Sequence, residues 1–149
     1  KFVEIRAART PDSRYIGKQY LKKPHKDVYE VKDLRRVKCE MDASPAGLIE
    51  LFELEPLHRR AAIGIIIKNK KDRNQGFGSE ALQLFCNYCF VHLGLHQVYA
   101  NVGAENVSSK ILFEKEGFIK TAQKLDWNLV NNDFKDELTY QLINDRNVY

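Results

Sequence analysis

The amino-acid sequence predicts a single domain of the mixed α/β class. First, residues 61–67 form a short apolar run that ends at a polar loop, and apolar residues then recur at helical spacing, which predicts a strand, a loop and a helix in succession. Second, residues 97–102 predict another strand, followed by a short helix over 107–116. Third, the segments 118–129 and 134–142 predict a long hairpin. A chain of 149 residues fits one domain that buries about two-thirds of its unfolded surface.

Further elements are expected on the N-terminal side of this unit. Apolar and polar residues alternate over 2–6, which predicts a first strand. A proline with a possible capping residue then introduces a helix over 14–21. The apolar spacing of 28–39 fits either a helix or a strand, and 41–45 predicts a turn. Residues 47–56 predict the strand that precedes the central unit.

Composition and charge narrow the classes of function. The chain is 44% hydrophobic and 30% charged, as is usual for a soluble globular protein, and no apolar run approaches the roughly 18 residues that span a bilayer. We therefore expect a cytoplasmic protein without a membrane partner. The net charge is +4, but the aromatic residues do not alternate with the basic clusters, which argues against nucleic acid as a partner.

The three cysteines do not predict a disulfide framework or a metal site. Their number is odd, and Cys86 and Cys89 lie two turns into the predicted helix, whereas redox pairs of this spacing begin a helix. We expect both thiols to be buried on the helix face, because free cysteine behaves as a small apolar residue.

A glycine-rich loop between the central strand and helix is the strongest functional signal. The stretch Arg73-Asn74-Gln75-Gly76-Phe77-Gly78 enters the helix at Ser79 and follows Lys68, Lys70 and Lys71. Glycines let a bulky anion approach the backbone, and the new helix adds free N–H donors with a partial positive charge. The stretch predicts a pyrophosphate cradle; the alternative is a tight strand-to-helix connection that binds nothing.

Acidic residues lie inside the apolar pattern of strand 47–56. Alternation places Glu53 on the same face as Leu51 and Glu50 on the other face. Since both faces are mostly apolar, at least one carboxylate is expected to be desolvated, which would raise its pKa and suit it as a general base. The alternative is that the acids lie at a sheet edge or pair with the arginines that follow.

Three motifs, in this order and separation, resemble the GNAT superfamily of N-acetyltransferases. They are Arg73-x-x-Gly76-x-Gly78, Ala104-Glu105-Asn106 and the segment from Ile111 to Phe118. The chain is most similar to the branch of ribosomal-protein N-terminal acetyltransferases and spermidine N-acetyltransferases, over roughly residues 28–143. The resemblance implies a central, mostly antiparallel twisted sheet that splays at the cofactor strand, helices on both faces and a C-terminal hairpin.

The resemblance also implies an activity and a set of site residues. The enzyme would transfer an acetyl group from acetyl-CoA to a primary amine, of a protein N-terminus or a polyamine, by direct attack in a ternary complex; the alternative is a non-catalytic acetyl-CoA-binding protein. The loop amides would hold the pyrophosphate, the preceding strand the pantetheine arm, and the asparagine the cofactor. The implied cofactor-binding residues are Ile65, Ile66, Ile67, Arg73, Asn74, Gln75, Gly76, Phe77, Gly78, Ser79, Asn106, Ser109 and Phe113. Glu53 and Glu55, near the end of the acidic strand, are the candidate catalytic bases.

The sequence departs from the family pattern in two places. Phe113 stands where the family often has a tyrosine that protonates the leaving thiolate, and phenylalanine has no proton to give. The stretch between Ile5 and Ser13 is shorter than the two helices that the family places there, so residues were deleted or, as we favour, are missing from the given sequence near positions 7–12.

A dinucleotide-binding loop is a rival interpretation of the glycine-rich stretch, but the next strand lacks the expected carboxylate. The acceptor amine is not predicted, and a homo-oligomer is compatible with the sequence.

Overall fold

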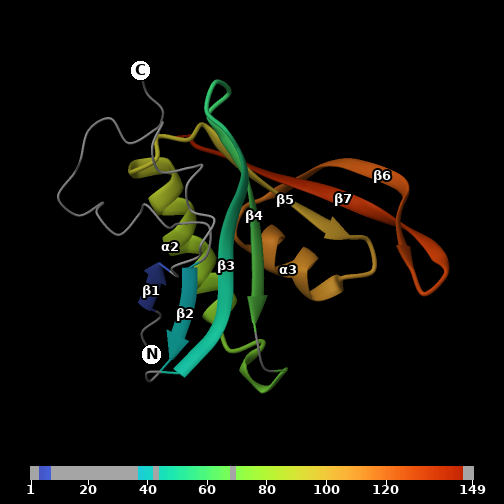
Figure 1. Ribbon diagram of the computed structural model, residues 1–149, viewed down its shortest axis with the longest axis horizontal. Coiled ribbons are helices and arrows are strands. Elements are labelled where there is room, and N and C mark those ends of the chain that lie inside the picture. Colours follow the sequence, from blue (N-terminus) through green and yellow to red (C-terminus); the bar gives the residue numbers. More distant parts are fainter. Residues whose placement is uncertain (1–3, 8–36, 42–43, 68–69, 146–149) are drawn as a thin grey trace.

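The structure is a computed structural model, and it describes residues 4–7, 37–41, 44–67 and 70–145 (Figure 1). The strands of this described part form one seven-stranded sheet in the order β1-β2-β3-β4-β5-β7-β6, in which only β4 and β5 pair in parallel. The strands are β1 (Glu4–Ala7), β2 (Val37–Met41), β3 (Ser44–Glu55), β4 (Arg60–Ile67), β5 (Gln97–Gly103), β6 (Ile119–Val130) and β7 (Asp133–Ile143). The helices are the short 3-10 turn η3 (Lys70–Asp72), α2 (Phe77–Val91) and α3 (Val107–Lys115).

Most of the predicted elements are confirmed. The first strand, the central strand-loop-helix unit, the strand and short helix that follow, and the C-terminal hairpin all form within a few residues of their predicted bounds. The strand expected at 47–56 begins earlier, at Ser44, because β3 pairs with β2 from there. The last residues of the ambiguous stretch 28–39 belong to β2. The helix predicted over 14–21, and the expected missing residues near 7–12, lie outside the described residues.

The two helices begin as their sequences predict. Gly76, the cap of α2, has a left-handed φ of 90°, which glycine adopts without strain, and α2 has no side-chain cap. Asn106 caps α3, because its side-chain oxygen accepts a hydrogen bond from the backbone N–H of Ser109 at 3.2 Å. Gly117, with φ of 86°, follows the end of α3 as the predicted stop. No helix in the described part is long and apolar enough to cross a bilayer.

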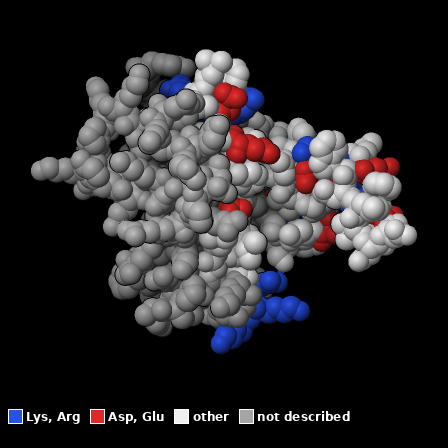
Figure 2. Space-filling model, in the orientation of Figure 1, with Lys and Arg blue, Asp and Glu red and all other residues white. Residues whose placement is uncertain are grey.

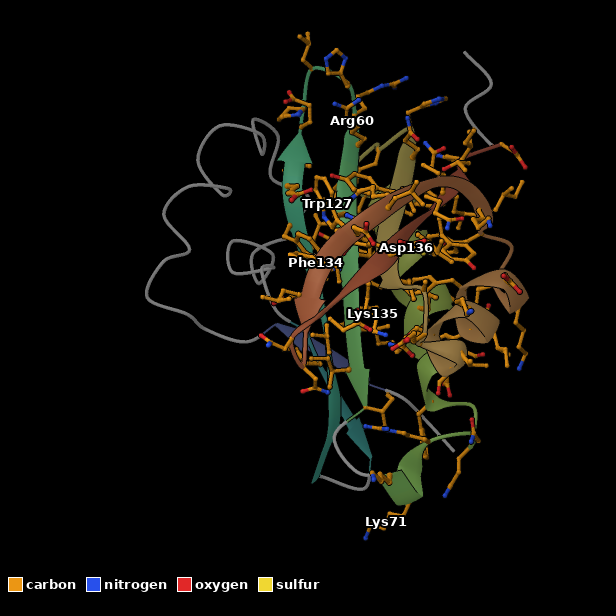
Figure 3. The ribbon with its side chains drawn as sticks, turned by 90° about the vertical axis from the view of Figure 1, so that its right-hand side faces the viewer. Arg60, Lys71, Trp127, Phe134, Lys135 and Asp136 are labelled. Atoms are coloured by element: carbon orange, nitrogen blue, oxygen red, sulfur yellow. The ribbon has the colours of Figure 1, made fainter. Side chains whose placement is uncertain are left out.

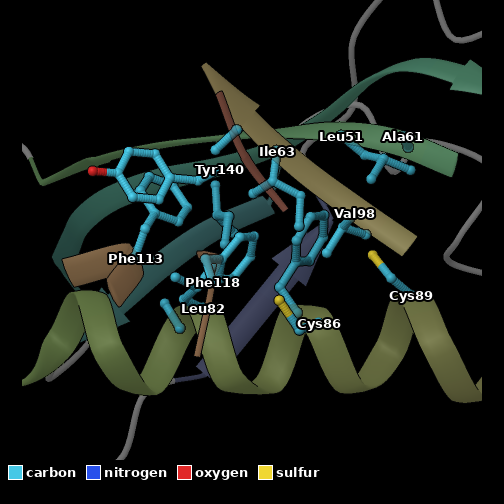
Figure 4. Close-up of a cluster of buried hydrophobic side chains, with 14 of the residues drawn as sticks. Leu51, Ala61, Ile63, Leu82, Cys86, Cys89, Val98, Phe113, Phe118 and Tyr140 are labelled. Atoms are coloured by element: carbon cyan, nitrogen blue, oxygen red, sulfur yellow. The ribbon is translucent and has the colours of Figure 1, made fainter. Parts of the chain in front are cut away.

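The sheet has two chemically different faces. Register pairs such as Leu51 with Ile63 and Ala100 with Tyr140 lie on one face, which we call the core face. Buried residues of α2 and the buried Phe113 of α3 join these strand residues in one hydrophobic cluster (Figure 4). Both described helices therefore pack on the core face, although helices were expected on both faces; the helix predicted over 14–21 is not described.

The opposite face carries many polar side chains, and we call it the polar face. Its register pairs include Glu50 with Gly64, opposite each other on β3 and β4, and Asn101 with Thr139 on β5 and β7. The Oδ1 atom of Asn101 accepts a hydrogen bond from the Thr139 hydroxyl at 2.9 Å. The polar groups of this face are thus fixed in position by the same register that builds the core.

Cys86 and Cys89 are buried on the inner side of α2, as predicted. Their exposed fractions are 6% and 0%, and Figure 4 shows both pointing from α2 towards the sheet. Burial raises the pKa of the Cys86 thiol to about 12 and that of Cys89 well above its usual value, so both remain protonated.

The hairpin of β6 and β7 extends away from α2 at the far side of the sheet (Figure 1). Its apolar side chains include Trp127 and Phe134, which are 59% and 58% exposed and lie on the hairpin as Figure 3 shows. The hairpin therefore adds little to the core beyond Leu138 and Tyr140.

The sheet opens between β4 and β5. These strands pair only from Arg60 with Gln97 to Ala62 with Tyr99. Beyond this point β4 continues to Ile67 paired with β3 alone, and β5 continues paired with β7. This gap, the sheet opening, confirms the splay expected at the cofactor strand.

Candidate active site

A cavity of about 210 Å³, the inner cavity, lies in the sheet opening. Its walls come from both faces of the sheet: Ile63 and Ile65 belong to the core face, whereas Glu50 and Gly64 belong to the polar face. The inner cavity thus connects the helix side of the sheet with its polar side. The remaining wall residues are Leu48, Ile66, Asn101, Val102, Gly103, Asn106, Ser109 and Phe113.

A larger cavity of about 460 Å³, the outer cavity, lies between the end of β4, the glycine loop and α3. It is lined by Ile65, Ile66, Ile67, Arg73, Asn74, Gly76, Gly78, Ser79, Asn106, Ser108, Ser109, Ile111, Leu112 and Lys115. Ile65, Ile66, Asn106 and Ser109 line both cavities, so the two adjoin at these residues. All of the residues expected to hold a cofactor except Gln75 and Phe77 therefore lie along one path.

The outer cavity has the properties of an anion site. No side-chain hydrogen bond caps α2 at Gly76, and the start of this helix carries a partial positive charge that favours an anion. Arg73, from the glycine loop, and Lys115, from the last turn of α3, add positive charge to the lining of this cavity. Figure 2 shows a group of basic side chains at the lower end of the molecule, where Figure 3 places Lys71. These groups fit the phosphates of a coenzyme A molecule.

Two residues of the predicted cradle do not line the outer cavity with their side chains. Phe77 is 2% exposed and belongs to the core. The side-chain amide of Gln75 donates to the carbonyl oxygen of Lys71 at 2.5 Å. A role of either residue in binding would rest on its backbone.

Phe113 lies on α3 at the wall of the inner cavity. Its ring is 3% exposed, packs edge-on against Phe118 with centroids 5.0 Å apart, and lies 6.4 Å from the ring of Tyr140 (Figure 4). The Tyr140 hydroxyl donates to Glu114 at 2.9 Å. Phe113 therefore supplies an apolar surface beside the inner cavity and no proton.

The position of Glu53 differs from the one that alternation predicts. The register of β3 against β4 shifts between Phe52 and Glu55, and Glu53 has a left-handed φ of 49°. This bulge breaks the period of two, so Glu53 is exposed and does not share the buried environment of Leu51. The prediction that Glu53 and Leu51 share a face is therefore wrong.

Tyr99 holds Glu53 at the closed end of the sheet opening. The Tyr99 hydroxyl donates to the Oε2 atom of Glu53 at 2.5 Å, across the small side chain of Ala62. Burial, and then the hydrogen bond to the Glu53 carboxylate, raise the pKa of Tyr99 to about 12. The phenol consequently remains a donor at neutral pH.

Glu50 is the glutamate of β3 that lines the inner cavity. It faces Gly64 on β4, where a Cβ atom would lie 3.6 Å from the Cγ atom and 3.9 Å from the Oε1 atom of Glu50. The tightest contact of such a Cβ atom would be with the ring of Phe52, whose Cε1 atom would lie 3.2 Å away, so glycine avoids crowding this ring more than the carboxylate. Neither of the two cavities is lined by Glu53 or Glu55, so the structure brings Glu50 closer to the site than the predicted pair.

Sequence reasoning missed one wall of the outer cavity. Ser108, Ile111, Leu112 and Lys115 have the spacing i, i+3, i+4 and i+7, which places them on one face of α3. Asn106, the cap of the helix, was already a predicted cofactor residue, so the helical spacing of the residues after it could have identified this face.

The chain matches the family model described as an acetyltransferase (GNAT) domain over residues 5–119. It is 26% identical to the spermidine N(1)-acetyltransferase of Escherichia coli (strain K12) over 155 residues, which cover 91% of this chain and 83% of that protein. The dodecameric structure of spermidine N-acetyltransferase from Vibrio cholerae is 25% identical, covers 95% of this chain and 93% of its own, and has a TM-score of 0.72. The structure of the Vibrio cholerae enzyme with CoA and spermine, 24% identical, covers 95% of both chains and has the same fold, with a TM-score of 0.73.

The resemblance derived from the motifs is therefore confirmed. The family match favours an enzyme over the alternative of a non-catalytic acetyl-CoA-binding protein. Since the family model covers most of the chain, and the glycine loop and the sheet opening fit coenzyme A, the chain belongs to the GNAT family of acetyltransferases, which use acetyl-CoA.

Proposed function

We propose that the enzyme acetylates a primary amine of an aliphatic polyamine, and that the amine attacks acetyl-CoA directly in a ternary complex. The observation that carries this proposal is the inner cavity, which has walls from both faces of the sheet and contains Glu50. Coenzyme A would lie along the outer cavity and reach the sheet opening past Ser109. The amine would approach from the polar face.

The carboxylates of β3 suit a cationic acceptor. Glu50 lies beside the sheet opening, and Glu53 and Glu55 follow it along β3 towards the end where β4 and β5 are paired. A polyamine arrives as a polycation, and a carboxylate favours its binding by charge and accepts the proton that the attacking nitrogen must lose. Glu50 is the nearest candidate for this base, and Glu53 and Glu55 are the further candidates.

Acetyl-CoA supplies the acetyl group as a thioester. The chain's own part in the reaction is to hold the thioester between β4 and α3, to place the amine beside it and to take up a proton at a carboxylate. Positioning of this kind accounts for a large share of catalysis when two substrates react directly. The relatedness to spermidine N(1)-acetyltransferases supports a polyamine over a protein N-terminus.

A thiol-release assay tests the proposal. Coenzyme A release from acetyl-CoA would be measured with polyamines, amino-terminal peptides, aminoglycosides and amino acids. We expect the highest kcat/KM for a polyamine. Faster acetylation of an amino-terminal peptide than of any polyamine would contradict the proposed acceptor.

Variants of the three glutamates test the assignment of the base. Loss of a positioned general base costs about 100- to 10,000-fold in turnover. We expect Glu50→Gln to show this loss. A larger effect of Glu53→Gln or Glu55→Gln than of Glu50→Gln would assign the base to the residue that the sequence predicts.

A further inference from the structure

The residues shared by the two cavities mark where the thioester of coenzyme A would pass. The outer cavity holds the features that suit phosphates, and the inner cavity contains the candidate base. Ile65, Ile66, Asn106 and Ser109 line both, so the sulfur atom, which lies between the phosphates and the acetyl group, would sit beside them. The two isoleucines have no polar side-chain atom. Among the residues that the structure describes, the side-chain donors at this junction therefore come from Asn106 and Ser109.

Ser109 is the better placed of these two donors. Asn106 is exposed, so the N–H donors of its amide are in contact with water, and its side-chain oxygen holds the amide at the cap of α3. Ser109 is half-buried and lies four residues before Phe113, so both side chains are on the cavity side of α3, one helical turn apart. A donor that is shielded from water stabilises a developing charge more strongly than an exposed one.

We propose that the hydroxyl group of Ser109 donates a hydrogen bond to the sulfur of coenzyme A as the thiolate leaves. The inference rests on the proposed direct transfer. As the bond between nitrogen and the acetyl carbon forms, the bond between carbon and sulfur breaks and its electron pair moves to sulfur. Ser109 stabilises that charge while keeping its own proton. The sulfur then takes a proton from water, and the nitrogen loses its proton to a carboxylate of β3.

This role would compensate for the apolar ring of Phe113. The ring lines the inner cavity but offers no donor to the sulfur, whereas the serine one turn earlier offers one at the junction. The hydroxyl group also has no role in the cap of α3, because the cap uses the backbone N–H of Ser109. Removing it by Ser109→Ala should therefore leave the helix intact, and alanine has the higher helix propensity.

The first test compares single-turnover rates, so that product release does not mask the chemical step. Ser109→Ala should lower the rate by about 10- to 100-fold, the effect of one hydrogen bond to a charged atom, with little change in the affinity for acetyl-CoA. Val107→Ala, on an exposed position of the same helix that lines neither cavity, is the control and should not change the rate. Phe113→Tyr should restore most of the loss in the Ser109→Ala protein and add less to the wild type.

The second test does not depend on turnover. The thiolate of bound coenzyme A absorbs in the ultraviolet, so a pH titration of the complex gives the pKa of its thiol, which is near ~8.5 in a free thiol of the cysteine type. Ser109→Ala should raise the pKa of the bound thiol by about one unit or more, because the charged form loses a donor. An unchanged pKa together with an unchanged single-turnover rate would overturn the proposal. If no amine in the panel is acetylated, the proposed function fails, while the titration still decides whether Ser109 contacts the sulfur.

Discussion

Replacing Gly78 by alanine should affect the stability of the fold and the affinity of the enzyme for coenzyme A differently. Gly78 lies in the first turn of α2 and lines the outer cavity. A Cβ atom there would meet the Cδ2 atom of Leu112 at 3.3 Å and its Cδ1 atom at 3.6 Å. Both are the ends of a flexible side chain, so Leu112 can move by the few tenths of an ångström required. Gly78→Ala should therefore fold.

Gly78→Ala should raise the stability of the fold and lower the affinity for coenzyme A. Alanine in place of glycine stabilises a helix by roughly 0.5–1 kcal/mol, and the contact with Leu112 offsets part of this gain. In the outer cavity the new methyl group would keep the phosphates of coenzyme A away from the backbone at the start of α2. Loss of one hydrogen bond to a charged group costs about 1.5–3 kcal/mol, which corresponds to a roughly 10- to 150-fold higher Kd for coenzyme A.

Calorimetric titration with coenzyme A and urea unfolding without ligand measure the two effects. Asn87→Ala, at an exposed position of the same helix, is the control and should change the Kd by less than about twofold. Gly76→Ala should instead lower the free energy of unfolding by about 1–2 kcal/mol, because alanine is strained at a φ of 90° even though its Cβ atom would meet nothing within 4 Å. A folded Gly78→Ala protein that binds coenzyme A as tightly as the wild type would refute the assignment of the phosphate site.

Three further outcomes follow from the site. Lys115→Ala should raise the KM for acetyl-CoA and weaken its dependence on salt, whereas Lys115→Arg should keep both; equal salt dependence in the alanine variant would argue against a phosphate contact. Asn106→Ala should lower the free energy of unfolding by about 0.5–2 kcal/mol through loss of the cap, as measured in urea, and an unchanged stability would contradict the capping role. The phenol of Tyr99 should ionise near pH 12, seen as the difference in phenolate absorbance between the wild type and Tyr99→Phe. Because its pKa is raised on folding, Tyr99 stabilises the fold below about pH 10 and loses this contribution as the pH rises towards 12. Glu53→Gln should lower the midpoint of the Tyr99 titration, and an unchanged midpoint would exclude the hydrogen bond.

The central unit could be predicted from the sequence because its signals are local. The apolar run of β4, the glycines before α2 and the cap at Asn106 each depend on residues within a few positions of one another. The same holds for the buried cysteines, whose helical spacing alone places them on the inner face of α2.

The positions of the acids could not be predicted in this way. The bulge at Glu53 depends on the pairing of β3 with β4, and its carboxylate is held by Tyr99, which is 46 residues away in the sequence. Likewise, Glu50 becomes a cavity residue only because β5 leaves β4 after Tyr99. Alternation along one strand contains no information about where a neighbouring strand departs.

The departure of β5 also leaves backbone groups of β4 without a partner strand on one side. From Ile63 to Ile67, the described sheet offers β4 only β3 as a neighbour, so every second amide faces the gap. In the free enzyme these amides should exchange their hydrogens with solvent faster than the amides of the same strand that face β3. An extended ligand that fills the gap would slow this exchange as an additional strand would, and hydrogen exchange could therefore locate the pantetheine arm residue by residue.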